Sequence, residues 1–243
     1  MTGVFRRAIR IEAGTDWAQA EIEDDFHHFV VRLRHDGRQV TAGRGEAVRH
    51  PWSLCPAAGA ALSALEGLAL SPNPAAVFTH TDPLGQCTHM FETAGLALSQ
   101  AFRGPGARRY DAHATDAVDG RSEVVLARDG QAVARWVLQD GVIAEPAEHA
   151  GRRPAEFRSR TLSELPPEAA EHLLILRRAA ILGPARTIDV DQFPTAADMK
   201  RGHACFVFSP ARAARAQRRY GSVRDFSTGP GPLAGPPPPS GEA

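Results

Sequence analysis

The chain has 243 residues, and its 28 lysine and arginine residues balance 28 aspartate and glutamate residues, so its formal net charge is zero. This balance argues against a general nucleic-acid-binding protein, whose phosphate contacts need a basic excess. Hydrophobic residues make up 43% of the chain, enough to build a core and too many for wholesale disorder. No apolar run reaches the length of about 20 residues that a membrane helix requires.

The start of the chain and its cysteines indicate the cellular compartment. Residues 1–14 lack the apolar stretch of a signal peptide. The chain has three cysteines, an odd number that does not suit a disulfide framework. We therefore expect a cytoplasmic protein with reduced thiols and no membrane segment.

Strand patterns fill the beginning of the chain. Residues 6–11 alternate in polarity, a second strand is predicted over residues 20–33, and a third over residues 40–48. Between the last two, the pair Asp36-Gly37 is a strong signal for a tight hairpin.

Two helices are predicted next, each with a cysteine at its start. The first covers residues 55–68, where Pro56 suits the opening turn, and the second covers residues 87–102. The stretch between them, residues 71–86, is rich in Pro, Asp and Asn and is predicted to be a loop.

A second block of strands follows. Strands are predicted over residues 110–118, 124–127, 132–138 and 142–143. The second and third of these are joined by Asp129-Gly130, another hairpin signal.

The last third of the chain is predicted to be mainly helical. A buried helix spans residues 166–183, a short strand residues 204–208, and another helix begins at Ser209-Pro210. That last helix would carry a basic stripe, Arg212, Arg215, Arg218 and Arg219. The stripe could bind a phosphate or a carboxylate, but a solvated helix face is the simpler interpretation.

These elements predict an α+β fold, with antiparallel strands in two blocks and helices packed on one face. Residues 1–228 would form a single domain, with one half over residues 5–102 and the other over residues 107–228. The Pro- and Gly-rich residues 229–243 are expected to be a disordered tail.

Cys55 and Cys87 are the most informative residues for chemistry. Each stands where a helix is predicted to begin, and the unpaired N–H groups there favour a thiolate. A thiolate is the form that a metal ligand or a nucleophile needs. The alternative is a purely structural role, in which both cysteines pack in the core.

Several residues near these cysteines in sequence could complete a site. His89 follows Cys87, and an acidic and His-rich stretch, residues 23–28, lies upstream. Two thiolates, the Asp25 carboxylate and one imidazole from His27, His28 or His89 would suit Zn²⁺ or Fe²⁺. Asp24 and Asp25 could also act as an acid–base pair, but adjacent strand residues point to opposite faces.

Five short motifs resemble a family of unknown function. They are residues 49–56 (Arg-His-Pro-Trp-Ser-Leu-Cys-Pro), 65–67 (Leu-Glu-Gly), 87–89 (Cys-Thr-His), 176–179 (Leu-Arg-Arg-Ala) and 221–227. The resemblance covers most of residues 5–228 and implies no activity.

Residues 20–102 are also similar, more distantly, to the iron–sulfur cluster scaffold family of the NifU/IscU type. Both have strands, a hairpin and two helices headed by cysteines. Asp25, Cys55 and Cys87 match that family's aspartate and its second and third cysteines, whereas Glu23 replaces its first cysteine and Gln86 its histidine. The resemblance implies a metal or cluster site with two thiolates.

Three functions remain open. The leading hypothesis is a protein that binds mononuclear Zn or Fe, or an iron–sulfur group, through Asp25, His28, Cys55, Cys87 and His89. The alternative is a metal-free enzyme for a small organic substrate, with Cys55 or Cys87 as nucleophile or acid and His89 or His28 as base. That enzyme would need a pocket lined by Phe and Trp. The third function is a structural or interaction role.

Overall fold

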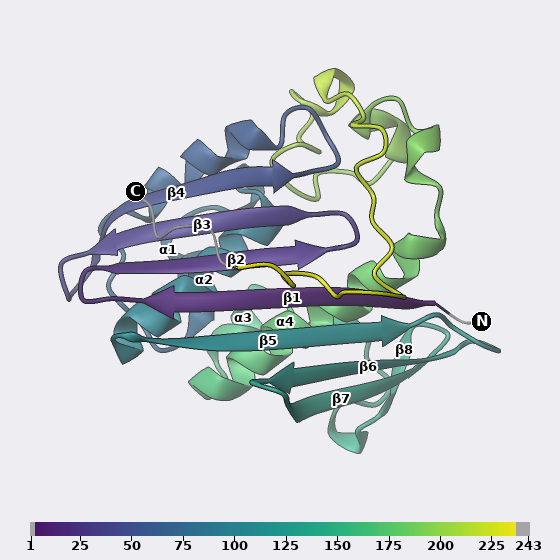
Figure 1. Ribbon diagram of the computed structural model, residues 1–243, viewed down its shortest axis with the longest axis horizontal. Coiled ribbons are helices and arrows are strands. Elements are labelled where there is room, and N and C mark those ends of the chain that lie inside the picture. Colours follow the sequence, from purple (N-terminus) through teal and green to yellow (C-terminus); the bar gives the residue numbers. More distant parts are fainter. Residues whose placement is uncertain (1–2, 237–243) are drawn as a thin grey trace.

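The computed structural model describes residues 3–236, which form an α+β fold around one antiparallel sheet (Figure 1). The strands are β1 (Val4–Ala13), β2 (Trp17–Asp24), β3 (His28–His35), β4 (Val40–Arg49), β5 (Gly106–Thr115), β6 (Arg121–Arg128), β7 (Gln131–Gln139) and β8 (Val142–Glu145). Their order across the sheet is β4-β3-β2-β1-β5-β6-β7-β8. The two predicted blocks of strands are thus one sheet, because β1 pairs with β5 from Val4↔Thr115 to Ala13↔Gly106.

Asp-Gly turns set the register of the hairpins. The predicted hairpins at Asp36-Gly37 and Asp129-Gly130 are confirmed. Asp129 (φ 49°) and Gly130 (φ 82°) both adopt positive φ, as a two-residue turn that matches the strand twist requires. The single strand predicted over residues 20–33 is wrong, since a tight turn at residues 25–27 divides it into β2 and β3.

Two long helices pack against the sheet. They are α2 (Thr88–Arg103) and α4 (Pro167–Leu182), and both were predicted; the shorter α1 (Val77–His80) and α3 (Ser159–Ser163) lie beside them. The helix predicted from residue 55 is instead a 3₁₀ helix over Pro56–Leu65. It lies so close to β4 that a Cβ atom on Gly59 would be 1.9 Å from the Gly45 carbonyl oxygen.

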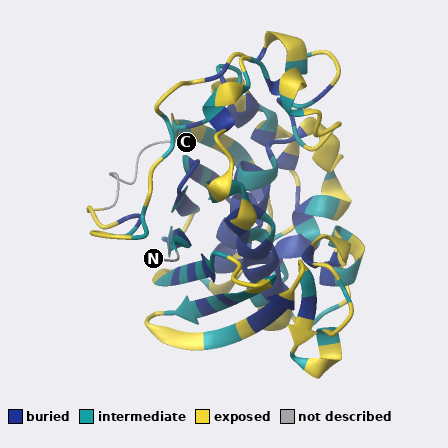
Figure 2. Ribbon diagram, turned by 90° about the vertical axis from the view of Figure 1, so that its right-hand side faces the viewer, coloured by how far each residue is buried: buried dark blue, intermediate teal, exposed yellow. Residues whose placement is uncertain are grey.

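The core lies between the sheet and these helices. α2 contacts β1, β2 and β3, whereas α4 contacts β5, β6 and β7. Figure 2 shows buried residues concentrated in this layer. Strand β1 alternates accordingly, with Phe5, Ile9 and Ile11 buried and Arg6 and Arg10 turned to the other face.

The chain after α4 departs from the sequence prediction. Residues 204–208 are not a strand, and between Ser209 and residue 236 there is only a 3₁₀ turn, Ala213–Arg215, in place of a helix. This segment hydrogen-bonds to neighbouring loops; for example, the Phe206 N–H donates to the Gln86 carbonyl (2.9 Å). Its basic residues therefore do not form a helical stripe.

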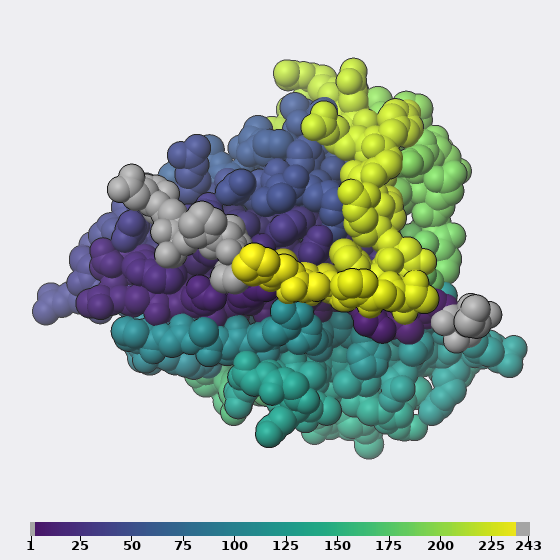
Figure 3. All heavy atoms as spheres, in the orientation of Figure 1, coloured from purple at the N-terminus to yellow at the C-terminus, as the bar shows by residue number. Residues whose placement is uncertain are grey.

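The last described residues cross the charged face of the sheet (Figure 3). The Leu233 N–H donates to Glu23 (2.8 Å), and its carbonyl accepts from Arg10 (2.9 Å) and Arg109 (3.1 Å). Residues 229–236 are thus not the disordered tail that composition predicts, and residues 237–243 lie outside the described residues. Among the described residues, no helix combines the length and apolar character needed to cross a membrane.

Candidate functional site

The tight turn between β2 and β3 is organised by the Asp24 carboxylate. Its Oδ1 atom accepts hydrogen bonds from the backbone N–H groups of Phe26 and His27, both at 2.9 Å, and from His27 Nδ1 at 3.0 Å. Its Oδ2 atom accepts from Arg7 Nη1 at 2.5 Å. Arg7 stands opposite Asp24 on β1, so the sheet register itself brings this pair together.

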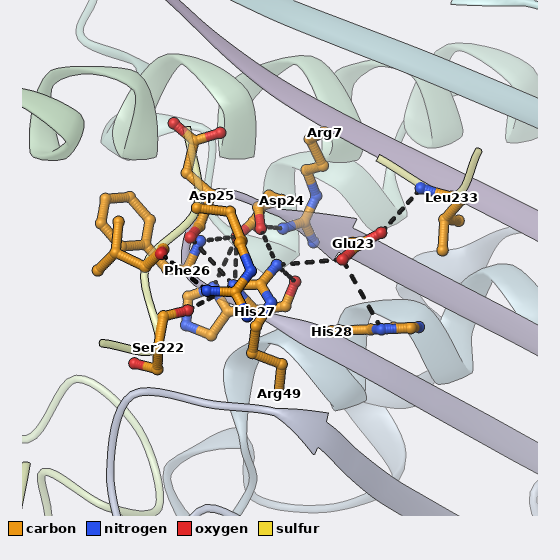
Figure 4. Close-up of polar contacts among 12 residues, drawn as sticks. Arg7, Glu23, Asp24, Asp25, Phe26, His27, His28, Arg49, Ser222 and Leu233 are labelled. Atoms are coloured by element: carbon orange, nitrogen blue, oxygen red, sulfur yellow. Dashed lines mark hydrogen bonds and ion pairs between the residues drawn. The ribbon is translucent and has the colours of Figure 1, made fainter. Parts of the chain in front are cut away.

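Arg49, at the end of β4, fastens the same turn from outside (Figure 4). Its guanidinium donates to the main-chain carbonyls of Asp24 (2.5 Å), Asp25 (3.0 Å) and His27 (3.2 Å). It also reaches the Ser222 carbonyl (2.9 Å) and so ties the turn to the C-terminal segment. Only the planar fork of an arginine can reach so many acceptors at once.

His89, in the first turn of α2, completes the site. Its imidazole stacks on that of His27, with ring centroids 3.9 Å apart and an interplanar angle of 29°. Burial lowers the pKa of His89 well below its ordinary value, and the nearby positive charges of Arg7 and Arg178 act in the same direction. His89 is therefore neutral, and its buried Nε2 has no hydrogen-bond partner among the described residues.

The Asp24 carboxylate stays ionised although it is 0% exposed. Burial alone raises its pKa, but the hydrogen bond from His27 and the charge of the Arg7 guanidinium together hold the pKa far below its usual range. A carboxylate can only accept hydrogen bonds, so His27 must carry its proton on Nδ1. Nε2 is then the ring nitrogen of His27 left for a ligand.

A second buried carboxylate lies behind this pair. Glu92 of α2 accepts from Arg177 Nη2 (2.5 Å) and from Arg178 Nε (2.8 Å) of α4, and it acts electrostatically on Arg7. The network consists of Arg7, Arg177, Arg178, Asp24 and Glu92. Its three guanidinium groups outnumber its two carboxylates, so its net charge is positive.

His27 and His89 line a cavity of about 110 Å³, here called the inner cavity. Its other walls are mainly apolar and come from the Pro51-Trp52 segment and from the chain after α4. The lining residues are Phe26, His27, Pro51, Trp52, His89, Leu182, Ala185, Val190, Met199, Arg201, Phe208 and Arg218.

Two residues predicted for the site lie elsewhere. His28 points to the other face of the sheet, where its Nε2 is 2.7 Å from Glu21 Oε1. Asp25 is buried beside Arg186, with 3.7 Å between its Oδ2 and Arg186 Nε. Neither side chain joins the His27–His89 pair, because alternation along the sheet sends His28 outward, while the turn directs Asp24, not Asp25, toward His27.

The two cysteines of the predicted site are neighbours, but they are sealed in the apolar core. Burial raises the pKa of Cys87 to about 12, and burial together with the nearby Cys87 raises that of Cys55. The helix-start position alone predicts the opposite direction. Cys205, in the segment that bonds to Gln86, is close enough to raise the pKa of both thiols further.

Of the predicted site residues, only His89 lines the inner cavity. From sequence, His27 is one option among three, and Arg218 belongs to the basic stripe over residues 212–219. The Asp24-x-x-His27 spacing could have indicated an Asx-type turn with the imidazole folded back. The spacing of the basic stripe indicated Arg218 only as part of a helix face, whereas the structure brings it to the inner cavity from a distant segment.

The arrangement is suited to proton transfer or to ligand binding through imidazole nitrogens. Within residues 3–236, Asp24, His27 and His89 are the one group of potential metal ligands whose donor atoms all lie within 4.8 Å of one another. However, both Asp24 oxygens already accept hydrogen bonds. Its carboxylate thus orients His27 better than it could bind an ion.

No protein-family model matches this sequence, and no curated protein is significantly similar to it. The two resemblances noted from the sequence therefore remain expectations. What the protein does must follow from the chemistry of the site itself.

Proposed function

We propose that this protein is an enzyme in which His27 acts as a general base on a small organic molecule bound in the inner cavity. The observation that carries the proposal is the buried Asp24–His27 pair at the wall of a mainly apolar cavity. A pocket with aromatic walls is also what the enzyme hypothesis requires, and Phe26, Trp52 and Phe208 supply them.

The roles follow from the protonation states. Asp24 holds the Nδ1 proton of His27, so Nε2 offers a lone pair to an acidic C–H or O–H group of a substrate. When Nε2 takes that proton, the imidazolium gains the adjacent Asp24 charge as a partner. Neutral His89 stacks beside it and can hydrogen-bond to a substrate oxygen through its unpartnered Nε2.

The surrounding structure keeps this geometry in place. Arg7 and Arg49 hold the β2–β3 turn from two sides. The proposal takes the helices to pack on one face of the sheet, as the sequence predicts, and takes Asp24 to lie on that face. Cys55 and Cys87 have no role in it, because neither lines the inner cavity.

The first test is the protonation state of His27. Two-bond ¹H–¹⁵N correlation spectra should show the proton of the His27 ring on Nδ1, and Asp24→Asn should disturb that pattern. A ring protonated on Nε2 in the native protein contradicts the base role.

The second test is catalysis. Short-chain ketones, acids and esters would be incubated with the protein in D₂O, and NMR would follow exchange of α-protons and ester hydrolysis. His27→Gln should reduce any turnover by about 100-fold or more, in line with the loss of a general base. His80→Gln, which replaces an exposed histidine, should leave it unchanged.

Metal binding is the second candidate function, favoured by the short spacing of the Asp24, His27 and His89 donor atoms. Two stacked imidazoles with one free nitrogen each suit Zn²⁺ or Fe²⁺. It ranks second because the buried network behind the site has a net positive charge and Asp24 is already saturated with hydrogen bonds.

Elemental analysis separates the candidates. Protein purified anaerobically without an affinity tag should contain far less than one zinc or iron per chain if the enzyme proposal is right. Stoichiometric metal that is lost in His27→Ala/His89→Ala supports the imidazole site. Metal lost only in Cys55→Ser/Cys87→Ser supports the thiolate site predicted from the sequence.

A further inference from the structure

Arg218 stands between the inner cavity and a second, more open cleft. Its main chain pairs with Trp52, and its N–H donates to the Pro194 carbonyl (2.8 Å). The side chain is 0% exposed and lines both spaces. A guanidinium so fully buried is costly unless each of its nitrogens has a partner.

Two of its three nitrogens have partners. Nε donates to Asp191 Oδ1 (2.7 Å) and Nη1 to the Pro51 carbonyl (2.9 Å). The third, Nη2, is buried and has no hydrogen-bond partner among the described residues. Two hydrogen bonds therefore hold the Arg218 guanidinium in place, and its Nη2 remains free to bind a ligand.

The second space, here called the outer cleft, has a volume of about 420 Å³ and a basic lining. It is formed by Val48, Arg49, His50, Arg218, Arg219, Tyr220 and Ser222, and none of these is acidic. The Ser222 hydroxyl is also buried without a partner among the described residues. Arg219 is exposed, and its charge adds to burial in lowering the pKa of the nearby His50.

We propose that the ligand of this site is an organic anion. Its apolar body occupies the inner cavity, and its carboxylate or phosphate group lies in the outer cleft against Arg218 Nη2, Arg219 and the Ser222 hydroxyl. This inference rests on the proposed function and names its substrate class. Arg218 and Arg219 are binding residues in it, and His27 remains the base.

The charge distribution supports an anion over a neutral ligand or a cation. Asp191 neutralises one side of Arg218, but Arg49 and Arg219 add positive charge to the cleft. Arg49 is partly neutralised by Glu23, with 3.3 Å between Nη2 and Oε1. Arginine forks recognise carboxylate and phosphate groups with short, charge-assisted hydrogen bonds.

The test uses four probes that separate the body of the ligand from its charge: hexan-1-ol, hexanoate, hexyl phosphate and inorganic phosphate. Titration calorimetry would measure the affinity of each for the full chain. We expect hexanoate or hexyl phosphate to bind at least about tenfold more tightly than hexan-1-ol, as one charge-assisted contact allows. The better of the two identifies the anionic group.

Variants assign the effect to the outer cleft. Arg218→Gln should abolish the advantage of the anionic probes, and Arg219→Gln should reduce it severalfold. Arg215→Gln removes an exposed arginine from the same segment and should have no effect. Because Arg218 is buried, circular dichroism must show that its variant folds; exposed Arg219 provides an independent test if it does not.

The outcomes distinguish the two proposals. Equal affinity for hexan-1-ol and both anions overturns the inference while leaving a cavity that binds small molecules. Inorganic phosphate binding as tightly as hexyl phosphate also overturns it, since the apolar body would then contribute nothing. Failure of all four probes to bind overturns the inference, whereas the proposed function is decided separately by the protonation state of His27 and by proton exchange in D₂O.

Discussion

Asp24 Oδ2 and Arg7 Nη1 lie 2.5 Å apart across neighbouring strands, and neither side chain is more than 2% exposed. This ion pair fixes the charge of the carboxylate that holds His27. A buried pair contributes little when intact, but removal of one partner leaves an uncompensated charge in the core. The site therefore depends on the pair for its orientation, and the fold depends on it for stability.

The first prediction concerns this pair. Asp24→Asn should lower the free energy of unfolding by about 3 kcal/mol, because the Arg7 guanidinium loses its charged partner while it stays buried. Urea denaturation measures the change. Asp111→Asn breaks a half-exposed pair with Arg109 and should cost under about 1 kcal/mol. Equal costs for the two variants contradict the buried-pair interpretation.

The second prediction concerns Asp25. Burial raises the pKa of its carboxyl to about 7, and the neighbouring Asp24 charge adds to the effect. A raised pKa in the folded state means that stability is lost as the pH rises from the unfolded value of 3.8 toward and through the folded value. Asp25→Asn should therefore be more stable than the natural protein, and the gain should grow between pH 5 and pH 8.

Thermal melts across that pH range test it. Glu148→Gln removes an exposed carboxylate (side chain 74% exposed) and serves as the control, with no pH-dependent gain expected. A gain for Asp25→Asn that is the same at both ends of the range excludes a raised pKa at this position.

The third prediction concerns the thiols. Burial raises the pKa of Cys55 and of Cys87, so both should react very slowly with a disulfide reagent at pH 8 in the native protein. Partly buried Cys205 should react first, and all three should react at once in urea. Mass spectrometry locates the label. Rapid labelling of Cys87 in the native protein contradicts the burial of its thiol. It would support the prediction from the sequence that this cysteine, at the start of a helix, is reactive.

The fourth prediction concerns the segment across the charged face. Leu233 is 6% exposed, so Leu233→Ala should lower the free energy of unfolding by about 2 kcal/mol. Leu84→Ala, at a site 48% exposed, should cost less than about 0.5 kcal/mol. A negligible cost at Leu233 means that this segment does not stabilise the sheet in solution.

Local sequence alone determined much of the fold. The Asp-Gly hairpins, helices α2 and α4 and the α+β class all follow from patterns a few residues long, because turn chemistry and hydrophobic periodicity act over that range. Predictions made where no such pattern exists were wrong. Residues 204–219 carry aromatic and basic residues, but several of their backbone groups bond to distant segments, such as Phe206 N–H to Gln86 and Arg218 N–H to Pro194, and the local bonds form only short turns.

The site belongs mostly to the tertiary structure. The sequence indicated His89 as a site residue. It did not indicate that the β2–β3 turn brings Asp24 and His27 to the site and leaves Asp25 and His28 outside it. That choice depends on which face of the sheet each residue meets, and a shift of one residue reverses it. Prediction from sequence fails for the same reason at Cys55 and Cys87. Their position at a helix start favours a thiolate, but burial raises the pKa of both thiols, and only the packing of the folded chain decides how buried they are.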